Sequence, residues 1–156
     1  MLWNLFSSFR PIFQDDEIAL YLSDEDVTNP EIGVKDGYTF DIYERKPRRR
    51  VGYVSLRLGE SPALYYLGHI GYRIEPPFRG HNYAAKACML LIPLMQNLNL
   101  KTICITANPE NTPSRKTCEK IGCELECIAP VPQCFRFVCA GATYKCRYIL
   151  KIPDQA

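Results

Sequence analysis

A strand that runs into a double proline, a short turn and then a long helix is the feature that most constrains this fold. Between residues 69 and 75 apolar and polar residues alternate, which is the period of a β-strand. Pro76 and Pro77 end that strand. From 82 to 98 the apolar residues recur at the period of an amphipathic helix. The turn at residues 79–84 therefore leads from a strand directly into a helix.

Periodic apolar residues also predict the elements on either side of this unit. Alternation predicts strands near residues 18–22, 38–42 and 54–58, an acid-rich loop with one helical turn at 23–37, and a hairpin tip at 45–50. Pro93 should kink the long helix or split off its last turn. Further on we expect a strand at 102–107, a helix at 113–121 between Pro113 and Gly122, and antiparallel strands at 135–138 and 144–152 that join near Gly141. The order of elements predicts a mixed α/β (α+β) domain.

Length and composition indicate one folded domain over residues 1–156. Hydrophobic residues make up 47% of the chain, which excludes intrinsic disorder, and no linker or repeat divides it. Nineteen basic and seventeen acidic residues give a net charge of +2, so no domain-wide field attracts nucleic acid. The apolar start at residues 2–13 is interrupted by polar residues and lacks signal-peptide features, which predicts an amphipathic helix and not a membrane span. We expect a cytoplasmic protein.

All eight cysteines occur from Cys88 onward, and their spacing argues against a metal site. The group from Cys118 to Cys146 contains no C-x-x-C pair, and neither histidine is near it in the sequence. Nothing indicates export, so disulfides are not expected either. We predict reduced thiols, several of them buried in place of apolar residues, and no metal.

The turn Arg79-Gly80-His81-Asn82-Tyr83-Ala84 is the candidate ligand site. N–H groups at the start of a helix have no intrahelical acceptor, and the helix dipole adds positive charge there. Gly80 and Asn82 tolerate a positive φ, and Ala84 leaves the first turn uncrowded. Such a turn either wraps an anion such as a pyrophosphate or simply connects a strand to a helix. The residues alone leave both interpretations open.

Two motifs in sequence order resemble those of the Gcn5-related N-acetyltransferases. That family carries Gln/Arg-x-x-Gly-x-Gly/Ala at the turn into the helix, matched here by Arg79, by Asn82 in place of the glycine, and by Ala84. Residues 108–122 are similar to the family helix Asn-x-x-Ser-x-x-x-x-Glu-Lys-x-Gly. The resemblance covers about residues 51–127 and is closest to the branch of ribosomal-protein and antibiotic acetyltransferases.

The resemblance implies a twisted, mixed, mostly antiparallel sheet flanked by helices, with a V-shaped opening for acetyl-CoA as co-substrate. Backbone groups of Tyr72 and Ile74 would bind the pantetheine, and Asn111 and Ser114 would face the cofactor. The pyrophosphate would bind backbone amides of the turn, at Arg79, Gly80, His81, Asn82, Tyr83 and Ala84. The family usually has two helices between its first two strands, for which residues 23–37 leave little room.

Direct transfer of an acetyl group needs a base for the amine, a donor for the oxyanion and a route for the thiolate. His69 is the first candidate base, and the alternative is a surface residue at the strand end. Glu75 lies on the same face, nearer the turn, and either assists catalysis, supports the turn or lies in solvent. Cys118 occupies the position where many relatives have an acidic tyrosine, and is either the acid or a buried structural thiol. A backbone N–H between Tyr72 and Ile74 would meet the oxyanion.

The resemblance therefore predicts an N-acetyltransferase that acts on a primary amine. The alternatives are a CoA-binding module without turnover and an acyltransferase with a different acyl-CoA donor. The acceptor stays open between a small amine, a polyamine, an aminoglycoside, and a protein N-terminus or lysine. The basic run at residues 45–50 is either a solvated turn or a contact for RNA or an acidic acceptor. Relatives often dimerise through sheet edges, but the sequence leaves open whether this chain forms a homodimer. Neither a membrane nor a nucleic acid is expected as partner.

Overall fold

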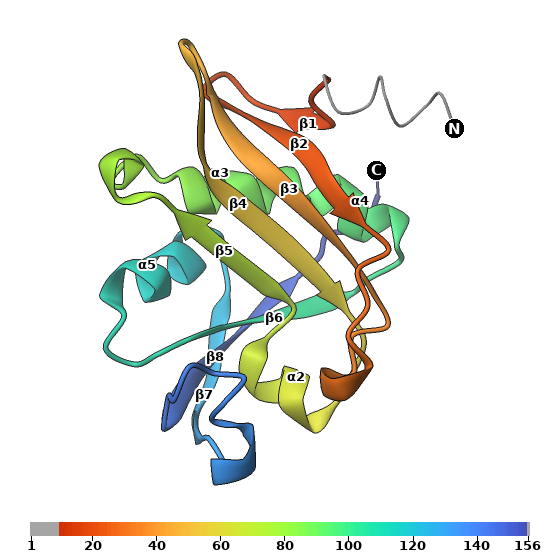
Figure 1. Cartoon of the computed structure of the whole chain (residues 1–156), viewed down its shortest axis with the longest axis vertical. Coiled ribbons are helices and arrows are strands. Elements are labelled where there is room, and N and C mark those ends of the chain that lie inside the picture. Colours follow the sequence, from red (N-terminus) through yellow and green to blue (C-terminus); the bar gives the residue numbers. More distant parts are fainter. Residues whose placement is uncertain (1–9, 156) are drawn as a thin grey trace.

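Two antiparallel sheets form the framework of the computed structural model, which describes residues 10–155 (Figure 1). The first sheet has the strand order β1-β2-β3-β4-β5, with β1 (Phe13–Gln14), β2 (Ile18–Glu25), β3 (Asp36–Arg45), β4 (Arg48–Leu58) and β5 (Ile70–Ile74). The second has the order β6-β8-β7, with β6 (Thr102–Ala107), β7 (Glu124–Pro130) and β8 (Tyr144–Lys151). The mixed α/β class with antiparallel sheets is confirmed. The amphipathic helix expected near the N-terminus falls in residues 1–9, outside the described part.

The long helix after the turn is confirmed, and it is split as its proline predicts. Helix α3 (Tyr83–Leu90) ends at Leu91, and α4 (Ile92–Asn97) begins with Pro93 in its first turn. The buried face of α3 carries small residues, which let the helix lie close to β2, β4 and β5. Its side chains join a core built from β2 to β6, β8 and the helices.

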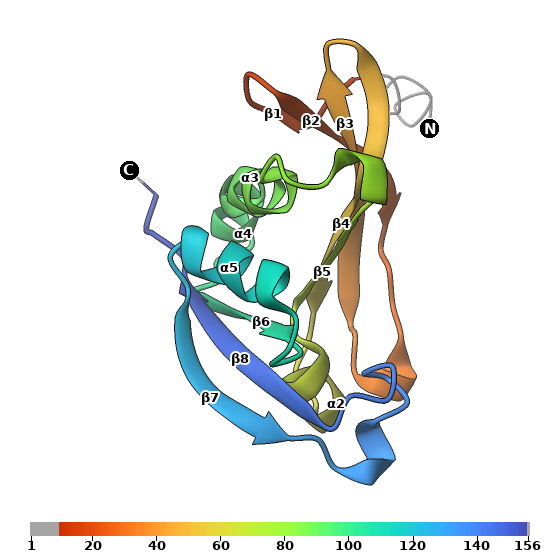
Figure 2. The ribbon, with the colours of Figure 1, turned by 90° about the vertical axis from the view of Figure 1, so that its left-hand side faces the viewer.

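The second helix predicted from the sequence is also present, within one residue of the expected bounds. Helix α5 (Thr112–Lys120) begins after Asn111, whose Oδ1 accepts a 3.2 Å hydrogen bond from the Ser114 N–H. It ends at Gly122, which has a φ of 89° and takes the left-handed conformation common after a helix. Figure 2 shows α5 beside β6, on the side of the molecule that α3 also occupies.

The strand expected at residues 135–138 is wrong. This segment follows a 3₁₀ turn (Gln133–Phe135) and pairs with no strand. Strand β8 pairs with β7 and β6 instead. Strand β7 lies at a sheet edge, and its Leu125 and Ile128 are both exposed, so the sequence lacks the apolar alternation of a buried strand. Phe137 gave residues 135–138 an apparent apolar alternation, although its side chain is 74% exposed.

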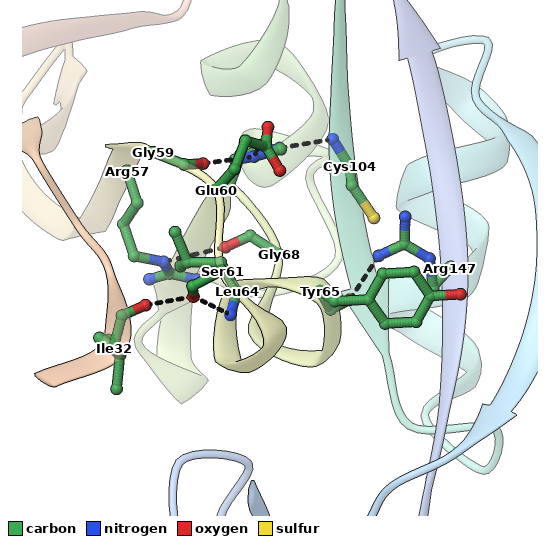
Figure 3. Close-up of polar contacts among 11 residues, drawn as sticks. Ile32, Arg57, Gly59, Glu60, Ser61, Leu64, Tyr65, Gly68, Cys104 and Arg147 are labelled. Atoms are coloured by element: carbon green, nitrogen blue, oxygen red, sulfur yellow. Dashed lines mark hydrogen bonds and ion pairs between the residues drawn. The ribbon is translucent and has the colours of Figure 1, made fainter.

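A short helix, α2 (Pro62–Leu67), connects β4 to β5 and lies where the two sheets come together. No sequence pattern predicted it. It is too short to show a helical period, although Ser61 accepts a 3.0 Å hydrogen bond from Leu64 N–H as its N-cap. Side chains of both sheets bind the carbonyls at its end. Arg57 of β4 donates to Gly68, and Arg147 of β8 donates to Tyr65 (Figure 3). Arg57 also donates to Leu67, and Thr106 of β6 donates to Tyr66 and Leu67.

The sheets diverge from α2 and give the V shape that the family resemblance implies (Figure 2). Within residues 10–155 a single backbone hydrogen bond connects the two sheets, from His69 N–H to Cys104 O at 2.7 Å. No ladder joins β5 to β6. The neighbouring edges of the two sheets are therefore separate over most of their length.

The basic hairpin tip between β3 and β4 protrudes from the rest of the chain (Figure 1). Its arginines have partners within the protein: Arg49 and Arg50 form ion pairs of 2.6 and 2.9 Å with Glu44 and Asp41. Arg48 lies 4.9 Å from the ring centres of both Tyr21 and Tyr43. These contacts favour the solvated turn over a contact for RNA. No helix within residues 10–155 has the length and apolar character needed to cross a bilayer.

Candidate active site

A cavity of about 820 Å³ opens between the two sheets. One wall consists of β5, the turn at residues 79–84 and the start of α3. The other consists of the end of β6, the loop after it and α5. The cavity therefore lies along the edge of β5 that carries no partner strand.

The free edge of β5 presents backbone groups to this cavity. Glu75 N–H donates to Val51 O, and Arg57 N–H donates to His69 O, so odd-numbered residues of the strand pair with β4. The backbone groups of the even-numbered residues point away from β4, at Ile70, Tyr72 and Ile74. Accordingly, Ile74 O accepts a 2.8 Å hydrogen bond from Nε of Arg79. The N–H groups of Tyr72 and Ile74 remain available to a ligand.

The turn before α3 has the conformation that its residues predicted. Gly80 has a φ of 90° and Asn82 a φ of 62°, both in the left-handed region. No side chain caps α3. Its first backbone hydrogen bond runs from Lys86 N–H to Asn82 O. In this turn and at the start of α3, the N–H groups of Gly80, His81, Asn82, Tyr83 and Ala84 have no acceptor among residues 10–155. Together with the helix dipole they form a site for an anion.

Hydroxyl and amide groups line the opposite wall. The Tyr72 hydroxyl and the Ser114 hydroxyl are 2.7 Å apart, and this contact connects β5 to α5. Burial raises the pKa of Tyr72 well above its ordinary value, so the phenol stays neutral. Oδ1 of Asn108 is buried at the cavity wall and has no hydrogen-bond partner among the described residues. An unpaired buried acceptor of this kind is rare and favours a donor from a ligand.

The structure brings the expected cofactor residues together around one cavity. Its lining contains Tyr72, Ile74, Arg79, Gly80, Asn82, Tyr83, Ala84, Asn111 and Ser114. His81 is not part of the lining, and its ring stacks on Tyr83 with the ring centres 5.3 Å apart. The role expected of His81 concerns its backbone N–H, so the position of the ring leaves that role a prediction.

The three expected catalytic side chains do not line the cavity. Nδ1 of His69 accepts a 3.0 Å hydrogen bond from Cys104 N–H, which places the ring proton on Nε2, 3.3 Å from both Gly59 O and Oε1 of Glu60. Figure 3 shows Gly59, Glu60 and Cys104 around this connection. His69 therefore holds the junction of the two sheets.

Glu75 and Cys118 are also placed away from the cavity. The Glu75 carboxylate faces solvent beside Arg73, at 3.7 Å. Cys118 is completely buried on the inner face of α5, where a hydrogen bond with Cys123 and burial both raise the pKa of its thiol. A thiol in that position reaches no ligand in the cavity. All eight cysteines lie in the described part and are free thiols there, and no cluster of metal-ligating side chains occurs in residues 10–155.

Two cations that the sequence analysis did not single out also line the cavity. Arg57 lies between Leu56 and Leu58 on β4, and Lys145 lies between Tyr144 and Cys146 on β8. Each stands between two apolar residues of its strand, which was the available signal. Because they belong to different sheets, only the folded structure brings them together.

Residues 8–124 match the family model described as the acetyltransferase (GNAT) domain, and the chain belongs to that family. The fold is similar to a Vibrio cholerae protein described as a ribosomal-protein-serine acetyltransferase, with 26% identity and a TM-score of 0.56, over 75% of this chain and 64% of that one. It is also similar to a ribosomal-protein-S5-alanine acetyltransferase from Vibrio fischeri, with 21% identity and a TM-score of 0.60, over 77% and 64%.

A third similar structure is the microcin C7 self-immunity acetyltransferase in complex with acetyl-CoA and AMP. Its identity is 19% and its TM-score 0.57, over 74% of this chain and 61% of that one. The chain thus spans less than two thirds of the length of these three structures. No protein with a curated description matches it.

Proposed function

We propose that this chain is an N-acetyltransferase that transfers the acetyl group of acetyl-CoA to a primary amine. The observation that carries the proposal is the pairing, in one cavity, of the amide-rich turn with the open edge of β5. A pyrophosphate needs several N–H donors and a positive dipole, which the turn supplies. A pantetheine arm carries amides that bind an unpaired strand edge, which β5 supplies.

The residues on the wall fit acetyl-CoA in three places. The N–H groups of Gly80 to Ala84 would hold the pyrophosphate, with Lys116 and Lys120 of α5 nearby in the lining. Backbone groups of Tyr72 and Ile74 would bind the pantetheine amides. Asn111 and Ser114 line the opposite wall, where the end of the arm would pass. When bound, acetyl-CoA supplies an activated thioester.

The wall supplies two of the three functions that transfer needs. The Tyr72 N–H would donate to the thioester carbonyl oxygen as that oxygen gains charge during attack by the amine. The Ser114 hydroxyl, held by Tyr72, would donate a hydrogen bond to the sulfur as the C–S bond breaks. The amine proton leaves through water, since no carboxylate or imidazole lines the cavity within the described residues. His69 and Cys118 would then support the structure.

A CoA-binding module without turnover is the second candidate, and the absence of an acidic or histidine side chain from the lining favours it. Both candidates share the cofactor site and differ in chemistry. A different acyl-CoA donor also remains open. The cytoplasmic location stays a prediction, and the formation of a homodimer stays open.

Calorimetry with acetyl-CoA tests the shared cofactor site. Asn82→Pro fixes a negative φ where the turn needs 62° and removes one N–H, so affinity should fall by about tenfold or more. Asn99→Pro is the matched control, because Asn99 is also left-handed, with a φ of 58°, and lies outside this cavity. Equal binding by wild type and Asn82→Pro, or none by a folded wild type, contradicts the proposal.

Release of free CoA thiol in the presence of amines separates the two candidates. Thiol release that depends on the amine, with the acetylated amine found by mass spectrometry, supports the enzyme. Tight binding of acetyl-CoA without any amine-dependent release supports the binding module.

A further inference from the structure

The charge of the cavity wall is one-sided. Among the residues that the structure describes, its lining contains no aspartate or glutamate. The basic residues in the lining are Arg57, Arg73, Arg79, Lys116, Lys120 and Lys145. Arg79, Lys116 and Lys120 belong to the turn and to α5, where the phosphates of CoA would lie. Arg73 of β5 faces Glu75 at 3.7 Å. Arg57 and Lys145 belong to neither the turn nor α5, and the cofactor phosphates do not account for them.

The position of Arg57 and Lys145 is the end of the cavity where the acceptor enters. The turn follows the last residue of β5, whereas Arg57 lies beside the first residues of that strand. Five strand residues span about 16 Å, so the two ends are well separated. A pantetheine arm that starts at the turn and follows β5 brings its thioester toward Arg57. An acceptor amine must approach from that side.

The Arg57 guanidinium has one edge bound and one edge free. Nε donates to Gly68 O at 3.1 Å (Figure 3), and Nη2 donates to Leu67 O at 3.3 Å. Nη1 lies over Gly71, where an added Cβ would be 2.7 Å away, and it has no acceptor within residues 10–155. Gly71 thus leaves room for the guanidinium against the strand, and Nη1 is available to a ligand.

Lys145 approaches from the second sheet and also lacks an anion. Its ammonium takes part in no hydrogen bond or ion pair within the described chain, although the side chain is half-buried. Burial lowers its pKa and the positive charge of Arg57 also lowers it, while Cys139 and the carboxylate of Glu110 act in the opposite direction. The register of β6 and β8 pairs Ala107 with Cys146, so Lys145 lies opposite Asn108, whose Oδ1 has no partner. Two partly desolvated cations that form no ion pair in the described chain are stabilised when an anion binds between them.

We infer that the acceptor is a primary amine that also carries an anionic group, a carboxylate or a phosphate, bound between Arg57 and Lys145. The inference rests on the proposed transfer reaction and specifies its substrate class. Polyamines and aminoglycosides, which are polycations, are repelled by this wall. The same positive charge lowers the pKa of the acceptor amine and favours the neutral, nucleophilic form. The C–N bond forms as the C–S bond breaks, and the amine proton passes to water.

Matched acceptor pairs test the charge requirement. One pair is β-alanine with β-alaninamide, and the other is phosphoethanolamine with ethanolamine. Comparison of the two pairs also distinguishes a carboxylate from a phosphate requirement. A charged acceptor should exceed its neutral partner by about tenfold or more in kcat/KM, the contribution of a charge-assisted hydrogen bond. In Lys145→Gln this preference should fall below about threefold while the affinity for acetyl-CoA is unchanged.

Two further variants keep the test decisive. Lys116→Gln should weaken acetyl-CoA binding and leave the acceptor preference intact. Arg57→Lys keeps the positive charge, whereas Arg57→Gln could unfold the α2 junction. Arg57→Lys should therefore reduce the acceptor preference only in part. Equal rates within both acceptor pairs, or a preference that survives in Lys145→Gln, overturn the inference.

Calorimetry covers the case in which no acceptor is turned over. Each charged amine is titrated into protein that is saturated with CoA. Binding that Lys145→Gln abolishes upholds the anion site even though the transfer reaction has failed. No binding of either charged amine overturns the inference, while acetyl-CoA binding by the same protein still supports the cofactor site.

Discussion

Lys120 and Asn82 join helix α5 to the turn before α3, through a 2.6 Å hydrogen bond from the lysine ammonium to Oδ1 of the asparagine. The family motif has glycine where this chain has Asn82. The asparagine backbone still adopts the left-handed conformation, with a φ of 62°. Its side chain gives the turn a connection to the opposite wall that glycine lacks. The departure from the motif therefore preserves the backbone and adds a contact.

A double-mutant cycle measures this connection. Asn82→Gly and Lys120→Ala each remove it, and both are exposed, so the coupling in the free energy of unfolding should be about 0.2–1 kcal/mol. Urea unfolding of the two single variants and the double variant gives the value. Asn82→Gly should retain acetyl-CoA binding within about threefold, because glycine also accepts a positive φ. Loss of binding in Asn82→Gly would mean that the side chain, and not the backbone, holds the ligand.

Removal of the Tyr72–Ser114 contact should slow transfer. Tyr72→Phe and Ser114→Ala should each lower kcat by about 10- to 100-fold, the effect of one hydrogen bond to a charged group. The KM for acetyl-CoA should change much less. Steady-state kinetics give both constants, and Tyr144→Phe is the control, since Tyr144 is exposed and outside the cavity. A rise in KM with kcat unchanged would assign the pair to cofactor binding alone.

Replacement of His69 should cost stability. His69→Ala leaves Cys104 N–H without its acceptor, which should lower the free energy of unfolding by about 1–3 kcal/mol. For a chain of this length that corresponds to a fall in Tm of about 3–10 °C. His69→Asn offers an amide oxygen in its place and should recover part of the loss. If instead kcat collapses in a stable His69→Asn variant and the pH–rate profile loses its acidic limb, His69 is a base.

Cys118 should prove dispensable for the chemistry. Cys118→Ala removes a fully buried thiol, so stability should fall by about 1–2 kcal/mol, while kcat is retained in the folded variant. Alkylation of the native protein followed by mass spectrometry should modify Cys134, which is exposed, before any buried cysteine. Rapid alkylation of Cys118 at neutral pH would contradict its burial.

Buried thiols should make the protein sensitive to alkaline pH. Burial raises the pKa of Cys88 from 9.0 to about 12, so the fold favours the neutral thiol. This contribution is complete below pH 9 and is lost between pH 9 and 12, by about 1.4 kcal/mol per pH unit. Urea unfolding at a series of pH values should therefore show a shallower decline in Cys88→Ala than in wild type. Cys134→Ala, at an exposed site, should decline as wild type does.

Regular elements with a clear apolar period could be predicted from the sequence, and the others could not. Strands β2 to β5 and both long helices show such periods because each has one buried face. Edge strand β7 has little to bury, and α2 is shorter than two helical turns, so neither shows a period. The turn around Asn82 could be located because its function depends on backbone conformation, which glycine and asparagine reveal. Arg57 and Lys145 meet through the packing of two sheets, which no local pattern records.

Because β5 and β6 do not form a ladder, the co-substrate would connect the two sheets when it binds between them. Paired strands resist separation at every hydrogen bond of their ladder, whereas these two neighbours share, in the described chain, a single backbone bond at His69. A pantetheine arm in the cavity would offer amide groups to β5 much as a missing strand would. Acetyl-CoA would then act as a surrogate strand between the sheets, and the loaded protein would have a more continuous interior than the free one.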